Sequence, residues 1–363
     1  MSTLAAIGVL AILIFVHELG HFLAARLQGI YADKFSIGFG PILLKYQGKQ
    51  TEYALRALPL GGFVGFPDDD PDSKIPPNDP NLLRNRPILD RAIVISAGVI
   101  ANLIFAYFLL SAQVGITGVQ RITYQPGVVV SGIAGNLSSA ASTAGIQAKD
   151  VILAVNGEEL GSAKPALVKL MGAIQDSVNQ PLTFEVQRGT ETLKLQVTPD
   201  PNNVGKGQIG VKLSPNANII FERAKNPVEA LTKGASEFER VVVLTVQGLA
   251  QLVTNFGETA SQVSGPIKIV EIGANIAESN AAGLIQFAAL ISVNLAVMNI
   301  LPLPALDGGQ LAFLLFEAIL GKPLPVKIQE TVMQTGLFLL LGLGVFLIIR
   351  DTANLAGVQQ FFK

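Results

Sequence analysis

The chain has 363 residues, of which 50% are hydrophobic, and its mean hydropathy of +0.47 is too apolar for an ordinary soluble domain. The formal net charge of −1 gives no reason to expect nucleic acid as a partner. Cysteine is absent and only two histidines occur, so a bound metal would need nitrogen and oxygen ligands, and a histidine site would have to use His17 and His21.

Four stretches are long and apolar enough to cross a bilayer, which takes about 20 mostly apolar residues. They are residues 4–25, 92–114, 281–306 and 331–349. The first could instead be a signal peptide, but no Lys or Arg precedes it, and a glutamate and two histidines follow its apolar run. We therefore predict four transmembrane helices.

Residues 27–91 separate the first two predicted spans. Apolar residues alternate at Phe35, Ile37 and Phe39 and again around Tyr53, with Gly and Pro between them, which is typical of short strands and hairpins. We expect Tyr53 to lie in an edge strand. The acidic residues that follow could suggest a calcium loop, but they lack the glycine and the distal glutamate of an EF-hand, so a solvated linker is favoured. They are Asp68, Asp69, Asp70 and Asp72.

The distribution of basic residues predicts the orientation of the chain in the membrane. Four arginines flank the first two spans on the side of the 27–91 loop, which indicates that this loop is cytoplasmic. They are Arg26, Arg84, Arg86 and Arg91. Residues 115–280 would then lie on the outer side.

The outer region is predicted to contain a compact domain over residues 124–199. Strands are expected at 127–133 and 150–155, followed by the turn dipeptide Asn156-Gly157, a helix over 163–175, and a hairpin of 181–187 with 191–197. A small strand-rich domain of this kind suits peptide capture by strand addition. Residues 226–256 should form a helix whose uncharged part has only 16 residues, so an interfacial or domain-packing helix is favoured over a fifth span.

The first span carries the sequence His17-Glu18-Leu19-Gly20-His21. Helix positions i and i+4 share a face, with Cβ atoms about 5–6 Å apart, so the two imidazoles can bind one Zn²⁺. Glu18 could take a proton from zinc-bound water and pass it to a leaving amine. The motif also occurs by chance in soluble helices, and histidines can be ordinary core residues. However, an acidic residue at the centre of a span costs about 2.5–3.5 kcal/mol on insertion scales, which favours a functional reason.

Catalytic zinc usually has three protein ligands, so a third must come from elsewhere in the chain. Glu52, the next glutamate, follows a loop punctuated by Gly and Pro and is a poor candidate. Asp307 is a better one, because it ends a long uncharged stretch whose two prolines and two glycines should break the helix. A broken helix at membrane depth is tolerated where it lines a protein or water-filled cavity. Alternatively, Asp307 caps a helix over residues 311–320, but a cap does not explain the prolines.

Two motifs in this order and spacing resemble the site-2 protease family. They are His17-Glu18-Leu19-Gly20-His21 and the segment 299–308, which reads Asn-x-x-Pro-x-Pro-x-Leu-Asp-Gly. The chain is most similar to the bacterial branch that regulates sigma-E-type stress responses. Residues 35–41 and 59–63 resemble the membrane re-entrant β-loop of that branch, and residues 264–267 and 292–295 also match it. Residues 144–157 resemble part of a PDZ domain.

The resemblance implies four core spans, a zinc ion held by His17, His21 and Asp307, and cleavage of substrate spans within the bilayer. The residues that it assigns to substrate binding are Asn299, Pro302, Pro304, Gly38 and Gly40. Two departures from the family stand out. Its best-known members in this branch carry two tandem PDZ domains, whereas only one is predicted here. Val99 also stands where the family has a proline in Ala-Gly-Pro-x-x-Asn, so the resemblance does not extend to the kink which that proline would produce.

The predicted fold is a polytopic α-helical membrane protein with about four transmembrane helices, a membrane-associated β-hairpin loop and an inserted PDZ-like α+β domain. Its parts are residues 1–116 with the first two spans, 117–205 with the PDZ-like domain, 206–280 as an extracytoplasmic or interfacial helical region, and 281–363 with the last two spans.

The predicted function is that of a zinc metalloendopeptidase of the inner (plasma) membrane, acting in regulated intramembrane proteolysis. Its partners would be the lipid bilayer and single-pass membrane proteins such as anti-sigma factors or signal-peptide remnants, with the catalytic site towards the cytoplasm. Two alternatives are a catalytically inactive scaffold and a metal transporter. A scaffold has no reason to retain Glu18, and a transporter would spread polar residues over its spans, whereas here they cluster at one site.

Overall fold

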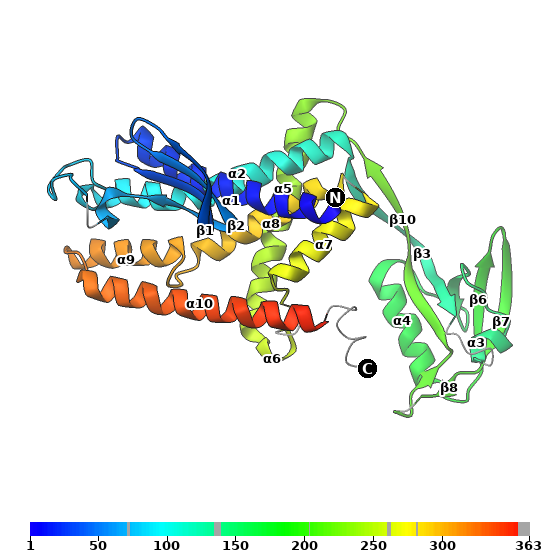
Figure 1. The fold of residues 1–363 in the computed structure, drawn as a ribbon. Helices are drawn as coiled ribbons and strands as arrows, with labels where there is room; N and C mark the ends of the chain where they lie inside the picture. The colour runs from blue at the N-terminus through cyan, green and yellow to red at the C-terminus, as the bar shows by residue number, and fades with distance from the viewer. Residues whose placement is uncertain (71–72, 134–138, 203, 260–262, 281, 355–363) are drawn as a thin grey trace. The chain divides into compact units, whose positions relative to one another are not determined.

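The computed structural model describes residues 1–70, 73–133, 139–202, 204–259, 263–280 and 282–354. The chain divides into two compact units (Figure 1). The first is made of Met1–Gly118 and Arg223–Lys363, and the second of Val119–Glu222.

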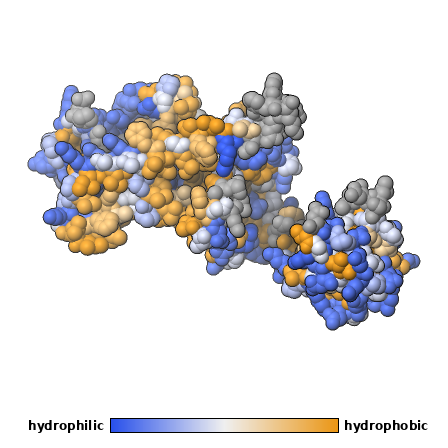
Figure 2. Space-filling view, turned by 90° about the horizontal axis from the view of Figure 1, so that it is seen from below, coloured by the Kyte–Doolittle hydropathy of each residue, from blue (hydrophilic) through white to orange (hydrophobic). Residues whose placement is uncertain are grey.

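Among the described residues, four helices are long and apolar enough to cross a membrane, which confirms the four predicted spans. They are α1 (Ser2–Leu27), α2 (Ile88–Ile116), α8 (Gly283–Ile300) and α10 (Val326–Asn354). The third span differs from its prediction, because the helix ends at Ile300 and α9 (Asp307–Leu320) begins after a break. On the face seen in Figure 2, apolar residues gather over the first unit, as expected for a surface that contacts lipid.

Small residues allow the helices of the first unit to pack closely. A Cβ atom on Gly20 of α1 would lie only 2.7 Å from the Cβ atom of Ala101 in α2. Farther along α2, the buried Ala106 packs with the buried Ala289 and Val293 of α8. Small residues at helix contacts are typical of membrane proteins, where backbones must approach closely to gain packing energy.

Helix α5 (Pro227–Thr254) runs across α2 and α8 (Figure 1). It begins at Asn226, whose side chain accepts a hydrogen bond from the backbone N–H of Glu229 at 2.8 Å, as an N-cap should. Val241 is buried against α2 and α8, and Thr245 donates a hydrogen bond to Asn294 of α8 at 3.0 Å. The described α5 is therefore a packing helix and is not one of the four candidate spans. Two further helices follow it within the predicted helical region 206–280, α6 (Phe256–Thr259) and α7 (Pro266–Ser279).

Between the first two spans lie two long strands, β1 (Lys34–Gln47) and β2 (Glu52–Gly65), which bend and pair twice. Phe35 lies opposite both Tyr53 and Val64, so the start of β1 lies between the two ends of β2. Tyr53 in turn lies opposite Phe35 and Tyr46. The prediction that Tyr53 lies in an edge strand is therefore wrong, and the edge of the sheet on this side is formed by residues 62–65.

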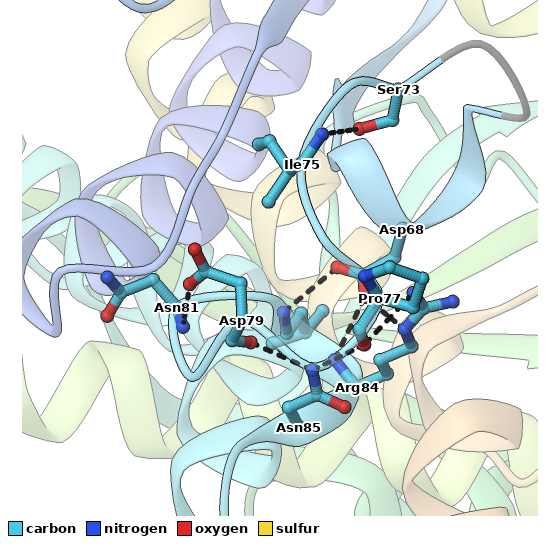
Figure 3. Close-up of polar contacts among 9 residues, drawn as sticks. Asp68, Ser73, Ile75, Pro77, Asp79, Asn81, Arg84 and Asn85 are labelled. Atoms are coloured by element: carbon cyan, nitrogen blue, oxygen red, sulfur yellow. Dashed lines mark hydrogen bonds and ion pairs between the residues drawn. The ribbon is translucent and has the colours of Figure 1, made fainter.

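The segment between β2 and α2 is ordered by its own side chains (Figure 3). It contains the short helices η1 (Pro67–Asp69) and η2 (Leu83–Asn85). The Asp68 carboxylate accepts hydrogen bonds from the backbone N–H groups of Leu83 at 2.9 Å and Arg84 at 3.3 Å, and it pairs with the Arg84 guanidinium. The side-chain amide of Asn85 donates to the backbone carbonyl of Pro77 at 2.9 Å.

These contacts overturn the solvated-linker prediction for the acidic segment. The Asp68 side chain is only 10% exposed. Asp70 pairs with Lys34 of β1 at 3.0 Å, which ties the segment to the sheet. Composition alone missed this, because the acidic side chains bind backbone N–H groups and a lysine that are distant in sequence. Asp72 lies outside the described residues.

The second unit is a mixed α+β fold built on one sheet with the strand order β10-β3-β4-β6-β7. Its elements are β3 (Val119–Ile133), α3 (Ala140–Thr143), β4 (Val151–Val155), β5 (Glu158–Glu159), α4 (Ala163–Asp176), β6 (Leu182–Arg188), β7 (Glu191–Val197), the short pair β8 (Asp200–Pro201) and β9 (Gly207–Gln208), and β10 (Val211–Glu222). Asn156 and Gly157 have φ angles of 51° and 82°, as a tight turn between β4 and β5 requires. Phe184, Ile152 and Leu170 are fully buried in its core.

The second unit extends to Glu222, beyond residue 205, the predicted end of the domain. The reason is β10, which pairs with β3 along its length, from Val211 opposite Ile133 to Glu222 opposite Val119. The first and last residues of the unit are therefore neighbours across one sheet.

Candidate metal centre

Three side chains from two distant parts of the chain meet inside the first unit. His17 and His21 lie one turn apart on α1, and their Nε2 atoms are 3.2 Å from each other. Asp307 at the start of α9 brings its Oδ2 atom to 3.2 Å from His17 Nε2 and 3.4 Å from His21 Nε2. The three candidate ligand atoms thus form a nearly equilateral triangle.

This triangle fits a tetrahedral zinc ion. Bonds of about 2.0–2.1 Å from zinc to nitrogen and oxygen would place the ligand atoms about 3.3–3.4 Å from one another. Asp307 Oδ2 is also buried and receives no hydrogen bond of regular geometry, as expected of an atom that would bind a metal ion. Two imidazoles and one carboxylate, without a thiolate, are a ligand set that suits zinc.

The backbone of α2 helps to hold the two histidine rings. The Nδ1 atom of His21 lies 2.8 Å from the backbone carbonyl oxygen of Val94, which can accept its hydrogen and leave Nε2 free as a ligand atom. Gly98, one turn farther along, makes room for both rings. A Cβ atom there would lie 2.8 Å from His17 Cε1 and 2.7 Å from His21 Cε1.

Asp307 reaches the histidines because the chain breaks between α8 and α9. Residues 301–306 fold back across the start of α9, with Ala305 in a left-handed conformation at a φ of 68°. A Cβ atom on Gly308 would collide with the carbonyl oxygens of Ile300 and Leu301, so the turn requires glycine there. The N-cap of α9 is Leu306, with no side-chain cap hydrogen bond. The alternative prediction, that Asp307 caps the following helix, is therefore wrong.

Glu18 is buried beside the triangle and contacts β2. Its carboxylate lies close to the backbone of Val64. Gly62 permits this approach, because a Cβ atom there would lie 2.8 Å from Glu18 Cγ and 2.9 Å from the carbonyl oxygen of Ser36. The edge of the sheet thus lies directly against the glutamate of the HExxH motif.

A cavity of about 670 Å³ contains this group. Besides His17, Glu18, His21 and Asp307, its lining includes Asn299 and mostly apolar residues from α1, β1, β2, α2, α8, α9 and the segments that connect them. Those residues are Ile14, Phe39, Gly61, Gly62, Phe63, Val64, Phe66, Leu83, Val94, Ile95, Asn102, Leu295, Ala305, Leu306 and Gln310. An apolar cavity with a few convergent polar groups is typical of a site that binds and transforms a ligand.

Comparison with known proteins assigns this arrangement to a family. The sequence profile of peptidase family M50 matches residues 5–343. The chain belongs to peptidase family M50. It is 62% identical to a protein of Nostoc sp. whose name describes a zinc metalloprotease, over 100% of both chains. It is also 50% identical to the membrane metalloprotease ARASP of Arabidopsis thaliana, described as chloroplastic, over 99% of this chain and 80% of that protein. This M50 peptidase is therefore a zinc metalloprotease.

The structure of the M50 peptidase brings some of the predicted site residues together and separates others. Asn299 lines the cavity, with its side-chain nitrogen 3.3 Å from His17 Nε2. Pro302, Pro304, Gly38 and Gly40 do not line the cavity. Pro304 instead packs closely against Gly336 of α10, and Gly38 adopts a φ of 88° where β1 passes the carbonyl groups of Arg56 and Leu58. Glu52 pairs with Lys45 at 2.6 Å and takes no part in the metal group.

The sequence did not predict the residues of the M50 site that matter because their backbone or small size lets other groups approach. Gly98, Gly62 and Val64 carry no side-chain chemistry, and their importance arises only where α2 and β2 meet α1. Asn102 does have a visible signal, since it is a polar residue in the middle of an uncharged span. In the sequence it stands out only as the asparagine of the family motif Ala-Gly-Pro-x-x-Asn.

Proposed function

We propose that this zinc metalloprotease cleaves the transmembrane segments of single-pass membrane proteins inside the bilayer. The observation that carries the proposal is the position of His17, His21 and Asp307. Their candidate ligand atoms all lie within 4.8 Å of one another, and both histidines belong to a helix that is apolar enough to span the membrane. The surrounding cavity is mostly apolar, as a site for a hydrophobic peptide segment should be.

In this proposal His17, His21 and Asp307 hold the zinc, which supplies an acidified water and polarises the peptide carbonyl when it is bound. Glu18 removes a proton from the attacking water, whose oxygen bonds to the carbonyl carbon. The same carboxyl group then delivers the proton to the amide nitrogen as the C–N bond breaks. Glu18 and Val64 both line the cavity, so the Glu18 carboxylate lies where it can serve in both steps.

The test is to purify Glu18→Gln and His17→Ala and to measure zinc content and cleavage of a transmembrane substrate. Glu18→Gln should keep its zinc and lose cleavage by a factor of about 10² or more, because it removes only the proton carrier. His17→Ala should lose both zinc and cleavage. Normal turnover by Glu18→Gln, or loss of zinc from it comparable to that of His17→Ala, would refute the assignment.

The substrate segment must unwind before it is cut. A helix holds its carbonyl groups in i to i−4 hydrogen bonds, and an extended segment in the membrane needs new partners for the groups that it frees. The strand at residues 62–65 offers such partners, because it forms the edge of the sheet and lines the cavity. The side-chain amide of Asn299 lies in the same cavity and can donate further hydrogen bonds.

A series of substrates with graded helix propensity around the scissile bond tests this step. Gly, Pro or Asn near that bond should speed cleavage, and a run of Leu should slow it. Cleavage rates that do not follow helix propensity across the series would rule out unwinding as part of the mechanism.

We also propose that the second unit is a PDZ domain that filters substrates by the size of their outer domains. Its main sheet, with α4 against β3 and β10, is an architecture that can accept an added peptide strand. The unit can be removed cleanly, since Val119 lies opposite Glu222 and the Ala224 N–H donates to the Val114 carbonyl at 3.2 Å. Replacing Val119–Glu222 by a short Gly-Ser linker should preserve zinc and allow cleavage of bulky substrates that are normally refused. Loss of cleavage of every substrate, with zinc retained, would contradict the filter.

The proposed orientation places the β1–β2 loop in the cytoplasm and the second unit outside, with the protein in the inner (plasma) membrane. The arginines at 26, 84, 86 and 91 support it, since basic residues near span ends favour the cytoplasmic side. Anti-sigma factors and signal-peptide remnants are the substrates proposed for this arrangement, because both present a single span. A cysteine introduced at Gln47 in β1 should react only with membrane-permeant thiol reagents in intact cells. The chain has no other cysteine, so any labelling comes from this position. Labelling by an impermeant reagent would show that the loop lies outside and would contradict the proposed orientation.

A further inference from the structure

Asn102 lies in the middle of α2 and is fully buried. Its side-chain nitrogen, Nδ2, is 3.4 Å from Nδ1 of His17, and its side-chain oxygen, Oδ1, is buried without a hydrogen-bond partner. The backbone carbonyl of the same residue accepts a hydrogen bond from Ser292 of α8 at 2.8 Å. The amide is thus held against the outer side of the His17 ring, away from the metal-facing nitrogen.

A histidine that binds metal through Nε2 must carry its hydrogen on Nδ1, and that hydrogen needs an acceptor. His21 has one, the carbonyl oxygen of Val94. For His17, the hydrogen-bond partner that the described residues offer at Nδ1 is the Asn102 amide. With Nδ2 facing the ring, two N–H donors would meet, which repels. Turning the amide by 180° places Oδ1 at the same position and supplies the acceptor.

In the orientation drawn, Oδ1 has no partner to hold it in place, so the choice between the two orientations is made at the imidazole. We infer that Asn102 is a positioning residue for the zinc site, with its Oδ1 atom accepting the hydrogen of His17 Nδ1 when the metal is bound. This contact fixes the tautomer and the plane of the His17 ring. It requires that His17 is a zinc ligand, as proposed above.

A purely structural role for this asparagine fits the contacts less well. Asn294 shows how an asparagine serves helix packing in this protein, since its Oδ1 accepts a hydrogen bond from Thr245 across the α5–α8 contact. The Asn102 side chain joins α2 to α1 through the ring of His17, which is a proposed zinc ligand and not a packing residue like Thr245. Its hydrogen bond goes to a histidine ring, and Ser292 bonds only to its backbone.

The experiment compares Asn102→Leu, Asn102→Asp and the control Asn294→Leu in the full-length protein, with His17→Ala as a reference. Zinc affinity is measured by competition with a chelator. Removing a contact of this kind typically weakens metal binding by about 10–100-fold, and this loss is expected for Asn102→Leu. Asn102→Asp should bind zinc as tightly as wild type or tighter, because a carboxylate accepts the same hydrogen bond. Asn294→Leu should keep wild-type affinity.

A second measurement reads the ring directly. The chain has only two histidines, so ¹⁵N-histidine labelling gives signals from His17 and His21 alone. In the zinc-loaded wild type both should show a protected Nδ1–H, and Asn102→Leu should lose the protection of His17 while His21 keeps its own. Wild-type affinity and protection in Asn102→Leu, or an Asn102→Asp protein as weak as Asn102→Leu, would overturn the inference. Retention of zinc by His17→Ala would instead overturn the proposed ligand set.

Discussion

Replacing Gly98 by alanine should disable the zinc site, whereas the same replacement at Gly115 in the same helix should leave it intact. At position 98 the new methyl group would lie 2.7–2.8 Å from the Cε1 atoms of both histidines and closer still to His21 Nε2. At position 115 the nearest atom would be the Cβ of Ala230, at 3.9 Å, which is ordinary van der Waals contact. The two variants therefore differ in where the methyl group is added and not in its chemistry.

The magnitude follows from the distances. Contacts of 3.4 Å and above are ordinary for a Cβ atom, so both rings would have to retreat by roughly 0.6–1 Å. Metal ligands tolerate departures of only about 0.2 Å from their bond lengths, so zinc affinity should fall by more than about 100-fold. A displacement of about 1 Å at a reacting centre costs on the order of 10² in rate. Helix propensity favours alanine over glycine by about 1 kcal/mol in both variants, so neither should fail to form α2.

The assay measures zinc per protein by elemental analysis and cleavage of one transmembrane substrate by all three proteins in the same lipid. Gly115→Ala should match the wild type in both. Gly98→Ala should be depleted of zinc and at least about 100-fold slower. Normal zinc and rate in Gly98→Ala would refute the argument that this glycine makes room for the rings, and equal losses in Gly115→Ala would show that any methyl group on α2 is harmful.

Three further results are expected. Asp307→Ala should lower zinc content and cleavage together. Helix α9 should stay protected from hydrogen exchange, since Asp307 makes no cap hydrogen bond. Full zinc content and full activity in this variant would place the third ligand elsewhere. Phe184→Ala should destabilise the second unit by about 3–5 kcal/mol, seen as faster hydrogen exchange in residues 119–222 at unchanged zinc content, because it empties a fully buried position. The Arg188 guanidinium, 2.8 Å from Asp150, holds the pKa of that carboxyl below its ordinary value. The stabilisation of the second unit by this pair is therefore full above about pH 4 and is lost as pH falls through the folded-state pKa of Asp150. Hydrogen exchange in the second unit should accordingly become faster at acid pH in the wild type, and this acceleration should be absent from Arg188→Ala.

The zinc motif could be predicted from the sequence because its geometry is local. Two histidines four residues apart share a helix face in any helix, whatever surrounds it. Asp307 could be predicted for a different reason, since a lone carboxylate at a break in an apolar segment is costly and needs a partner. The predicted end of the third span was wrong because residues 301–306 are as apolar as the helix before them, whereas the backbone leaves the helix at Leu301.

The sheet and the acidic segment were harder to predict. Alternation of apolar residues says which face of a strand a side chain occupies, but it does not say which strand lies next to it. Tyr53 was therefore misplaced at an edge, although its strand was expected. The Asp68 network depends on backbone N–H groups 15 and 16 residues away, which composition does not reveal. Asn102 and Gly98 gain their meaning from the closeness of α1 and α2, which no single segment encodes.

The pairing of Val119 with Glu222 has a consequence for how such proteins diversify. The second unit leaves and rejoins the rest of the chain at adjacent points, so a genetic insertion, loss or duplication at this junction would not alter the path of the helices on either side. The candidate ligands at positions 17, 21 and 307 all lie outside the junction. Gene rearrangements can therefore change the number and kind of domains inserted at this point while natural selection keeps the same helices around the candidate metal centre.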